Sequence, residues 1–234
     1  ILDTSLITCT GKTVKENLEE YKFAYPENPE IIKTVEEPFS HTGGVAVLEG
    51  NLAPHTAISK PGAIDPSLHH YVGKARCFDS EEAAEEAILG GVIQPGEVVV
   101  IRYEGPKGGP GMREMFKAMK FMYGAGRSKT CALITDGRFS GASTGPVIGH
   151  CSPEAVDGGP IALVEEGDLI EIDVKERKLN IIGVNGVHKT PEEIDEILKK
   201  RRKNWKPRAP KYSKGVMGLF TRHAVSPMKG AYLE

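Results

Sequence analysis

The amino-acid sequence predicts an α/β domain built on a twisted, mostly β core that is barrel-like and flanked by helices. Three observations support this prediction. Short apolar runs rich in β-branched residues recur along the chain, as is typical of buried strands. Segments with helix-capping signals alternate with them, and at least one pair of strands is joined by a short polar turn. No internal repeat with a fixed period is present.

The predicted strands and helices follow one another along the whole chain. Ser80 has the position of an N-cap before an apolar helical face, and the pair Thr190-Pro191 opens a helix with proline at its first position. Thr13 and Glu16 have the spacing of a capping box. The expected strands span residues 44–48, 98–101, 131–134, 160–164 and 168–174, with a return strand at 179–182. The expected longer helices span residues 80–90, 113–123 and 190–203.

The chain is expected to consist of two parts. Residues 1–40 are interpreted as a segment that connects to an N-terminal domain outside this sequence, and three prolines between residues 25 and 39 predict an extended linker there. Residues 41–234 are interpreted as a C-terminal α/β domain with a C-terminal tail. The absence of an initiator methionine at Ile1 supports the expectation that the chain is part of a longer protein.

Composition and charge exclude several classes of protein. With 30 basic and 32 acidic residues the net charge is −2, so no strong attraction to nucleic acid or to an anionic membrane is expected. The basic run at residues 199–203 is interpreted as a solvated helix end that complements the helix dipole, in preference to a nucleic-acid patch. No apolar stretch approaches the roughly 18 residues of a membrane span.

The four cysteines are widely spaced. Cys9, Cys77, Cys131 and Cys151 form no CxxC pair and have no histidine cluster beside them, which argues against a zinc site or an iron–sulfur cluster encoded in this chain alone. So few cysteines in a chain of this size are typical of a reducing compartment, and a cytoplasmic location is expected.

A glycine-rich segment, residues 103–114, lies between a predicted strand and a predicted helix. It matches neither the Walker A pattern nor GxGxxG. Its backbone N–H groups near a helix start suit an anion, but a purely structural turn fits the spacing equally well. Glu114 is predicted to lie in the first helical turn, where a capping role and a ligand role are about equally supported.

A second loop rich in glycine and serine spans residues 135–145. Ser140 lies in this loop, but the GxSxG pattern of a nucleophile elbow is absent, so a hydrolase triad is not supported. A serine can act as a base where a neighbouring cation or metal lowers its pKa. Arg138 is a candidate for that cation, and the alternative is that it pairs with Asp136. His150 is a candidate acid or base, although a lone histidine is more often structural.

Together these segments resemble the dihydroxy-acid/6-phosphogluconate dehydratase family. The matching motifs occur in the family's order and cover nearly the whole chain: TCTGKT…EN at residues 8–17, GGVAVLEGNLAP at 43–54, YEGPKGGPGMREM at 103–115, LITDGRFSGASTGPVIGHCSPEA at 133–155, GGPIAL at 158–163 and YSKGV at 212–216. The DGRFSG and GHxSPEA motifs point to the dihydroxy-acid branch more than to the sugar-acid branches.

This resemblance implies a reaction and a fold. The family removes water from a 2,3-dihydroxy acid to give a 2-keto acid, using Mg²⁺ and an iron–sulfur cluster, and its C-terminal part is a swivelling β/α domain around a barrel-like core. By motif position, Ser140 is the implied catalytic base and Glu114 the implied magnesium ligand. Gly141, Ser143 and His150 are implied substrate contacts. The cluster ligands and the other metal ligands are implied to lie in the N-terminal domain.

Two departures from the family pattern concern substrate choice. His55-Thr56 replaces the usual Asp-Gly after the NLAP motif, and Ser143-Thr144 replaces Thr-Arg. The preferred hypothesis is the C-terminal half of a hydro-lyase of valine and isoleucine biosynthesis, active with its own N-terminal domain, as a homodimer. An aldonic-acid dehydratase acting on a gluconate-type substrate is one alternative. A stand-alone anion-binding module without catalytic activity is the other.

Overall fold

The computed structural model describes residues 2–22, 24–25, 28–141 and 143–234, so Ile1, Phe23, Pro26, Glu27 and Ala142 lie outside the described residues. The chain divides into two compact units, Ile1–Gly43 and Gly44–Glu234. The first unit contains helix α1 (Val14–Glu19), which begins at the predicted capping box. The Thr13 hydroxyl accepts a hydrogen bond from the backbone of Glu16, whose carboxylate accepts one from the backbone of Thr13.

The second unit is built on one nine-stranded sheet with the order β1-β2-β6-β5-β4-β3-β7-β8-β9. Its four central strands, β6, β5, β4 and β3, are parallel, and each outer pairing is antiparallel. The strands are β1 (Ala46–Leu48), β2 (Thr56–Ser59), β3 (His70–Phe78), β4 (Glu97–Ile101), β5 (Ala132–Thr135), β6 (Val147–Ser152), β7 (Leu169–Asp173), β8 (Lys178–Val184) and β9 (Val187–His188).

The sheet curls until its two ends meet. Glu49, which follows β1, forms a bridge with Lys178 at the start of β8. Its N–H donates to the Arg177 carbonyl at 3.0 Å, and its carbonyl accepts from the Leu179 N–H at 3.0 Å. The inner face of this curl contains an apolar cluster with members from β1 through β8, including Leu48, Val100 and Ile172. The predicted α/β class with a barrel-like core is therefore confirmed.

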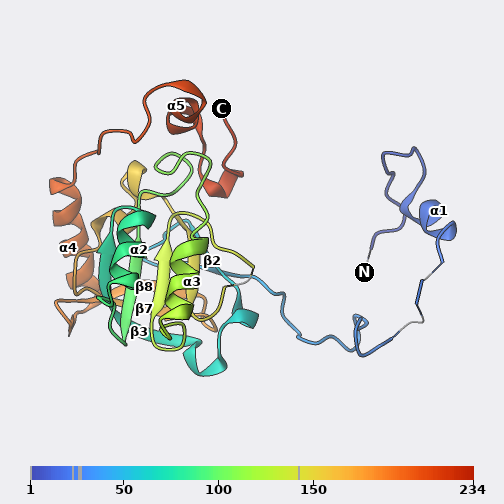
Figure 1. Ribbon diagram of the computed structural model, residues 1–234, viewed down its shortest axis with the longest axis horizontal. Helices are drawn as coiled ribbons and strands as arrows, with labels where there is room; N and C mark the ends of the chain where they lie inside the picture. The colour runs from blue at the N-terminus through green and yellow to red at the C-terminus, as the bar shows by residue number, and fades with distance from the viewer. Residues whose placement is uncertain (1, 23, 26–27, 142) are drawn as a thin grey trace. The chain divides into compact units, whose positions relative to one another are not determined.

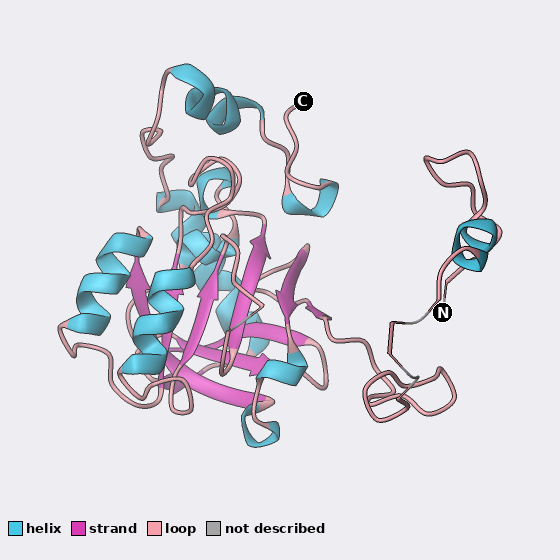
Figure 2. Ribbon diagram, turned by 45° about the vertical axis from the view of Figure 1, so that its right-hand side comes forward, coloured by secondary structure: helices cyan, strands magenta, loops and turns pink. Residues whose placement is uncertain are grey.

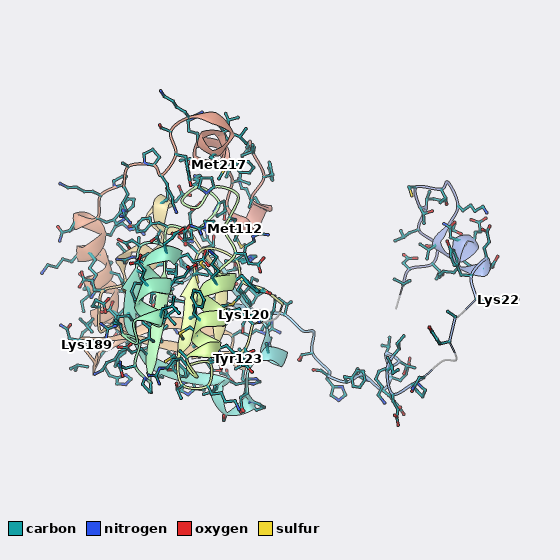
Figure 3. The ribbon with its side chains drawn as sticks, viewed as in Figure 1. Lys22, Met112, Lys120, Tyr123, Lys189 and Met217 are labelled. Carbon is teal, nitrogen blue, oxygen red and sulfur yellow. The ribbon has the colours of Figure 1, made fainter. Side chains whose placement is uncertain are left out.

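Helices α2 and α3 cover the outside of the curled sheet (Figure 1). The helices are α2 (Glu81–Leu89), α3 (Phe116–Gly124), α4 (Pro191–Asn204) and α5 (Gly215–His223), with 3₁₀ turns η1 (Pro61–Ala63), η2 (Pro66–Leu68), η3 (Ala155–Asp157), η4 (Pro160–Leu163) and η5 (Pro227–Lys229). Helices α2 and α3 lie side by side, and a second apolar cluster fills the space between them and the sheet. Figure 3 shows Lys120 and Tyr123 on α3 and Met112 in the loop that precedes it.

Several predicted elements differ from the observed ones. The strand expected at residues 160–164 is wrong, because this segment forms the 3₁₀ turn η4, which starts at Pro160 and pairs with no strand. The helix expected at 113–123 begins later, at Phe116. Strands β2, β3, β6 and β9 were not predicted. Helix α4 confirms the predicted start, with Thr190 as N-cap in a capping box with Glu193.

Candidate functional site

Two loops leave the same end of the sheet. One follows β4 and contains the glycine-rich segment, and the other follows β5 and contains Ser140. Strands β4 and β5 are parallel neighbours, paired from Val98 with Ala132 to Ile101 with Thr135, so both loops start at the carboxyl edge of the sheet (Figure 2). In open α/β sheets, ligands bind preferentially outside this edge.

Backbone hydrogen bonds join the two loops and bring Glu114 close to the loop of Ser140. The Arg138 N–H donates to the Arg113 carbonyl at 2.7 Å, and the Met115 N–H donates to the Arg138 carbonyl at 2.8 Å. Glu114 therefore forms a parallel bridge with Arg138, two residues before Ser140. The Glu114 side chain is exposed.

This pairing corrects the predicted position of Glu114. The residue was expected in the first helical turn, but α3 begins at Phe116 with Met115 as its N-cap. The backbone of residues 113–115 bonds to the neighbouring loop, and those bonds hold it outside the helix. A dipole-stabilised capping role for Glu114 is therefore excluded. Its carboxylate lies on the surface of the sheet edge, where a ligand can reach it.

A tight turn fixes the backbone of Ser140. Its carbonyl accepts hydrogen bonds from the Ser143 N–H at 3.3 Å and from the Ser143 hydroxyl at 2.9 Å. Ser140 is half-buried, Gly141 is exposed and Ser143 is buried. The Ser143 hydroxyl thus has a structural partner, and its substrate contact, like that of Gly141, stays a prediction.

Asp136 is buried directly below this turn and binds the backbone. Its carboxylate accepts hydrogen bonds from the N–H groups of Tyr103 (3.1 Å), Glu104 (3.0 Å) and Ala155 (2.8 Å). The expected alternative, an Asp136–Arg138 pair, is wrong, because the Arg138 Nε donates to the Met112 carbonyl at 2.6 Å. Burial and the nearby Glu104 carboxylate raise the pKa of Asp136 to about 6, against the lowering effect of the three N–H donors.

Glu154 plays the same role for the glycine-rich loop. Its carboxylate accepts hydrogen bonds from the N–H groups of Lys107 and Gly108, both at 3.0 Å. Burial and the nearby Asp136 raise the pKa of Glu154 to about 7. The glycine-rich loop was expected to bind an anion through its N–H groups. At Lys107 and Gly108 these groups bind the Glu154 carboxylate of the protein itself.

Glu104, Asp136 and Glu154 form a buried carboxylate group that sequence reasoning missed. All three are at most 2% exposed. A signal was present in the sequence, because Asp136 directly follows the β5 run and Glu104 closely follows the β4 run, where an acidic residue can bind the N–H groups of an adjoining loop. Their common function in the structure is to fix the two loops at the carboxyl edge.

His150 occupies a bulge in β6. Between the pairs Thr56–Ser152 and Ile58–Gly149 the register shifts, so β6 has one residue more than β2. His150 has φ of 56°, and its N–H donates to the Gly137 carbonyl at 2.9 Å. Such bulges redirect side chains and are frequent near active sites. Burial lowers the pKa of His150, and the positive charges of Arg138 and Lys60 lower it further.

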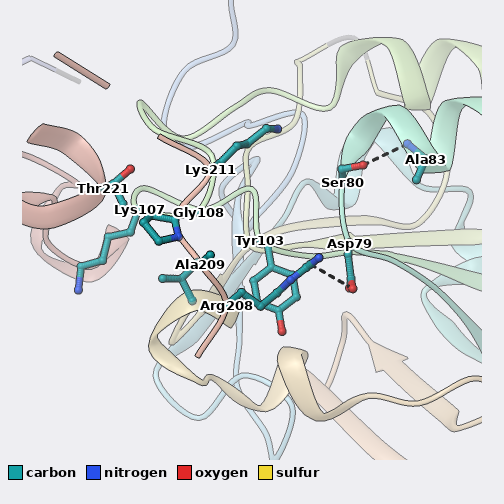
Figure 4. A pocket seen from close by; sticks show the side chains of 12 residues that line it. Asp79, Ser80, Ala83, Tyr103, Lys107, Gly108, Arg208, Ala209, Lys211 and Thr221 are labelled. Atoms are coloured by element: carbon teal, nitrogen blue, oxygen red, sulfur yellow. Dashed lines mark hydrogen bonds and ion pairs between the residues drawn. The ribbon is translucent and has the colours of Figure 1, made fainter. Parts of the chain in front are cut away.

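A cavity lies at the same edge but beside β3 and β4. Its volume is about 400 Å³, and it separates the end of β4 from the C-terminal tail. In Figure 4, Arg208 lies across the ring of Tyr103, at 4.6 Å from the ring centroid. Arg208 also pairs with Asp79 at 3.1 Å. Neither Glu114 nor Ser140 lines this cavity, so it is distinct from the edge around Ser140.

In the described part of the chain, no group of three or more His, Cys, Asp or Glu side chains is arranged to bind a metal ion. The four cysteines are free, and burial raises the pKa of Cys77 to about 12 and that of Cys151 still higher. None of the described helices is long and apolar enough to cross a membrane.

The fold and the edge define a class: an α/β domain that presents a carboxylate and a loop serine on one exposed wall, suited to a site completed by further residues. Comparison with known proteins gives the family. Residues 30–231 match the model described as dihydroxy-acid/6-phosphogluconate dehydratase C-terminal. The chain belongs to this family and corresponds to its C-terminal portion.

Several similar proteins share one name and align with the entire chain or nearly all of it. The dihydroxy-acid dehydratase of Lachnoclostridium phytofermentans is 51% identical over 234 residues, which is 100% of this chain and 40% of that protein. That of Caldanaerobacter subterraneus subsp. tengcongensis is 50% identical over 231 residues, 99% of this chain and 39% of that protein. That of Ruminiclostridium cellulolyticum is 47% identical over 234 residues. The chain thus spans about two fifths of the length of these relatives.

Proposed function

We propose that this chain is the C-terminal part of a hydro-lyase that converts 2,3-dihydroxy-3-methyl carboxylic acids to 2-keto acids in valine and isoleucine biosynthesis. The observation that supports this most is the identity of about half of all residues with dihydroxy-acid dehydratases along the full chain. The backbone pairing of Glu114 with Arg138, in the loop that contains Ser140, is consistent with this proposal.

In this proposal Ser140 is the catalytic base. Its Oγ takes the proton from C2 of the substrate, and the electron pair of that C–H bond forms the C2–C3 double bond as the C3–O bond breaks. The C3 hydroxyl leaves as water after it receives a proton, and the resulting enol becomes the 2-keto acid. The Ser143 hydrogen bonds to the Ser140 carbonyl keep the backbone of the base in place while this happens.

Glu114 is the proposed magnesium ligand from this chain. Its exposed carboxylate forms no ion pair with the described residues, and carboxylate oxygens are preferred ligands of Mg²⁺. The proposal assigns the other metal ligands and the cysteines of an iron–sulfur cluster to the N-terminal domain. When bound, these two groups supply the Lewis acidity that makes the C3 hydroxyl a leaving group. Gly141 and His150 border the substrate in this arrangement.

The proposal extends to the assembly. The enzyme works with its own N-terminal domain, as a homodimer in the cytoplasm, on a small-molecule substrate. The free state of all four cysteines is consistent with a reducing compartment. Sedimentation of the full-length enzyme tests the homodimer.

Replacement of Ser140 by alanine in the full-length enzyme tests the base. We expect kcat for 2,3-dihydroxyisovalerate to fall by about 10³-fold, since general-base catalysis contributes about 10² to 10⁴. The absorbance of the cluster should be unchanged. Thr130→Ala is the matched control, because Thr130 is an exposed hydroxyl residue before β5, at the opposite end of the strand. Near-normal turnover by Ser140→Ala would refute the assignment.

The same assay separates the two substrate classes. With 2,3-dihydroxyisovalerate and gluconate offered to the wild-type enzyme, we expect kcat/KM to favour the branched dihydroxy acid by at least about 10²-fold, which is the discrimination that contacts of a shaped pocket typically provide. Preference for gluconate would instead establish an aldonic-acid dehydratase.

A further inference from the structure

A positively charged corner lies near Ser140, and its two cations, Lys60 and Arg138, have no part in the proposed mechanism. Lys60 directly follows β2, which pairs with β6 through Ile58–Gly149 and Ser59–Ile148. Its ammonium lies 4.5 Å from the centroid of the Phe139 ring. Phe139 immediately precedes Ser140, so the charge of Lys60 lies against the residue before the proposed base.

The buried ring of Phe139 fixes the position of the Lys60 ammonium. Phe139 is 8% exposed and belongs to the apolar cluster under α2 and α3. Its ring lies against Gly149, where even a Cβ atom would overlap the Phe139 Cδ1. A cation on an aromatic face is attracted by the ring quadrupole. The half-buried Lys60 side chain therefore packs against a ring that is itself held by close contact with Gly149.

Arg138, which directly precedes Phe139 in the sequence, adds a second cation. Its Nε donates to the Met112 carbonyl at 2.6 Å, and its side chain is exposed. The bulged His150 lies within reach of both positive charges. Two cations, Lys60 and Arg138, thus act on the same imidazole, and one of them lies on the ring of Phe139.

Among the residues that the structure describes, no carboxylate forms an ion pair with Lys60 or Arg138. Other cations on the same edge are paired. These pairs are Arg102 with Asp79, Lys107 with Asp157 and Arg113 with Glu81. A half-buried ammonium without a counter-ion is stabilised when an anion binds beside it.

We propose that Lys60 is a substrate-binding residue whose ammonium, with Arg138 beside it, binds one carboxylate oxygen of the acid that Ser140 deprotonates. This inference rests on the proposed dehydratase function. The contact between Lys60 and Phe139 has a use in this proposal. The ring holds the ammonium, and therefore the bound carboxylate, at a set distance from the loop that contains Ser140. The second carboxylate oxygen remains available to other groups of the site.

Equilibrium binding to the full-length enzyme tests the proposal without turnover. The probe is 2-hydroxyisovalerate, which lacks the C3 hydroxyl, and its neutral amide is the comparison; both are measured by calorimetry. We expect Lys60→Met to weaken binding of the acid by at least tenfold and to leave binding of the amide within twofold. Lys60→Arg should retain acid binding within threefold. Lys175→Met, at an exposed lysine in the turn between β7 and β8, should change neither.

Equal weakening of acid and amide, or no weakening of either, overturns the proposal. Wild-type binding of the acid that is no tighter than that of the amide overturns it as well. In steady-state assays Lys60→Met should raise KM tenfold with kcat within threefold. A fall in kcat with a shifted pH profile and an unchanged KM would mean that Lys60 acts on Ser140 instead. Charge-selective binding without any turnover of 2,3-dihydroxyisovalerate would refute the dehydratase function and leave the carboxylate site standing.

Discussion

At the scale of single residues, buried carboxylates shape the loops that present Ser140 and Glu114. Asp136 and Glu154 together accept hydrogen bonds from five backbone N–H groups of neighbouring segments. Burial removes the water that would compete for these N–H groups. The loops at the carboxyl edge are therefore fixed from inside the protein, before any ligand binds.

These two carboxyl groups give stability a specific dependence on pH. The folded state raises the pKa of Asp136 from 3.8 to about 6 and that of Glu154 from 4.5 to about 7, so the folded chain keeps both protons to higher pH than the unfolded chain. Their contribution to the free energy of unfolding is complete below about pH 4 and is lost as the pH rises through these values. We expect Glu154→Gln to reduce the loss between about pH 5 and pH 7.

Urea denaturation of the chain at several pH values measures this effect. Glu176→Gln is the control, because Glu176 is exposed in the turn between β7 and β8 and should leave the slope against pH unchanged. A Glu154→Gln variant with the wild-type slope would contradict the role assigned to Glu154.

The contact between Gly149 and Phe139 gives a second prediction. An alanine at position 149 would place its Cβ within the Phe139 ring, which is buried in the cluster under α2 and α3. Overpacking of this kind costs about 1–3 kcal/mol of stability. We expect Gly149→Ala to lower the free energy of unfolding by that amount. Gly62→Ala, where a Cβ meets no atom within 4 Å, should change it by less than about 0.5 kcal/mol. Equal effects of the two substitutions in urea denaturation would exclude the overlap.

At this scale the sequence identified the motif residues but did not predict which residues contact them. The motifs identified Ser140 and Glu114 as residues of interest, but spacing along the chain could not show that Glu114 pairs with Arg138 across two loops. It also could not show that the Lys107 and Gly108 N–H groups are taken by Glu154, which is 46 residues from Gly108. Both facts depend on the parallel pairing of β4 and β5, which is a long-range property of the fold.

At the scale of elements, α4 is anchored by a buried ion pair. Arg201 donates to Asp168 at 2.5 and 2.9 Å and to the Leu163 carbonyl at 3.0 Å. The Asp168 side chain is fully buried and that of Arg201 is 10% exposed. The basic run at residues 199–203 does end a helix, as predicted, but its interpretation as solvated is wrong for Arg201, which joins α4 to the start of β7.

Removal of one partner should therefore be costly. We expect Arg201→Met to lower the free energy of unfolding by about 3–5 kcal/mol, because the Asp168 carboxylate stays buried without its counter-ion. The double variant Arg201→Met with Asp168→Leu should recover much of this loss. Lys203→Met, an exposed cation two residues on, is the control. If Arg201→Met and Lys203→Met are equally stable in urea, the anchoring role is refuted.

Element prediction succeeded where capping or β-branched runs were strong. Strand β3 was missed because its inward positions include Gly73 and Ala75, which give little hydrophobic signal although the burial alternates along the strand. Gly73 is required there, since a Cβ would meet the Gly96 carbonyl and the Tyr71 ring. The apolar run at Pro160 was misassigned because a run of four residues fits a strand or a turn equally well, and only tertiary contacts decide between them.

At the scale of the whole molecule, the proposed site is composite. The described part of this chain offers the exposed Glu114 carboxylate beside the Ser140 loop and no group of three metal-binding side chains. Proton removal by Ser140 requires that its pKa be lowered and that the departing hydroxyl be activated. The proposal assigns both requirements to groups held by the N-terminal domain. Catalysis should therefore depend on joining the two domains, whereas folding of the curled sheet should not.

Expression of residues 1–234 alone tests this division. We expect the isolated chain to unfold cooperatively in urea, because its sheet closes on itself through Glu49 and Lys178 and encloses its own apolar cluster. We expect no formation of 2-keto acid from 2,3-dihydroxyisovalerate, even with Mg²⁺ present and after iron–sulfur reconstitution. The full-length enzyme, treated identically, should turn over at a rate typical of metabolic enzymes, about 1–10³ per second. Turnover by the isolated chain that Ser140→Ala abolishes would show that the site is complete without the N-terminal domain, and the composite arrangement would be wrong.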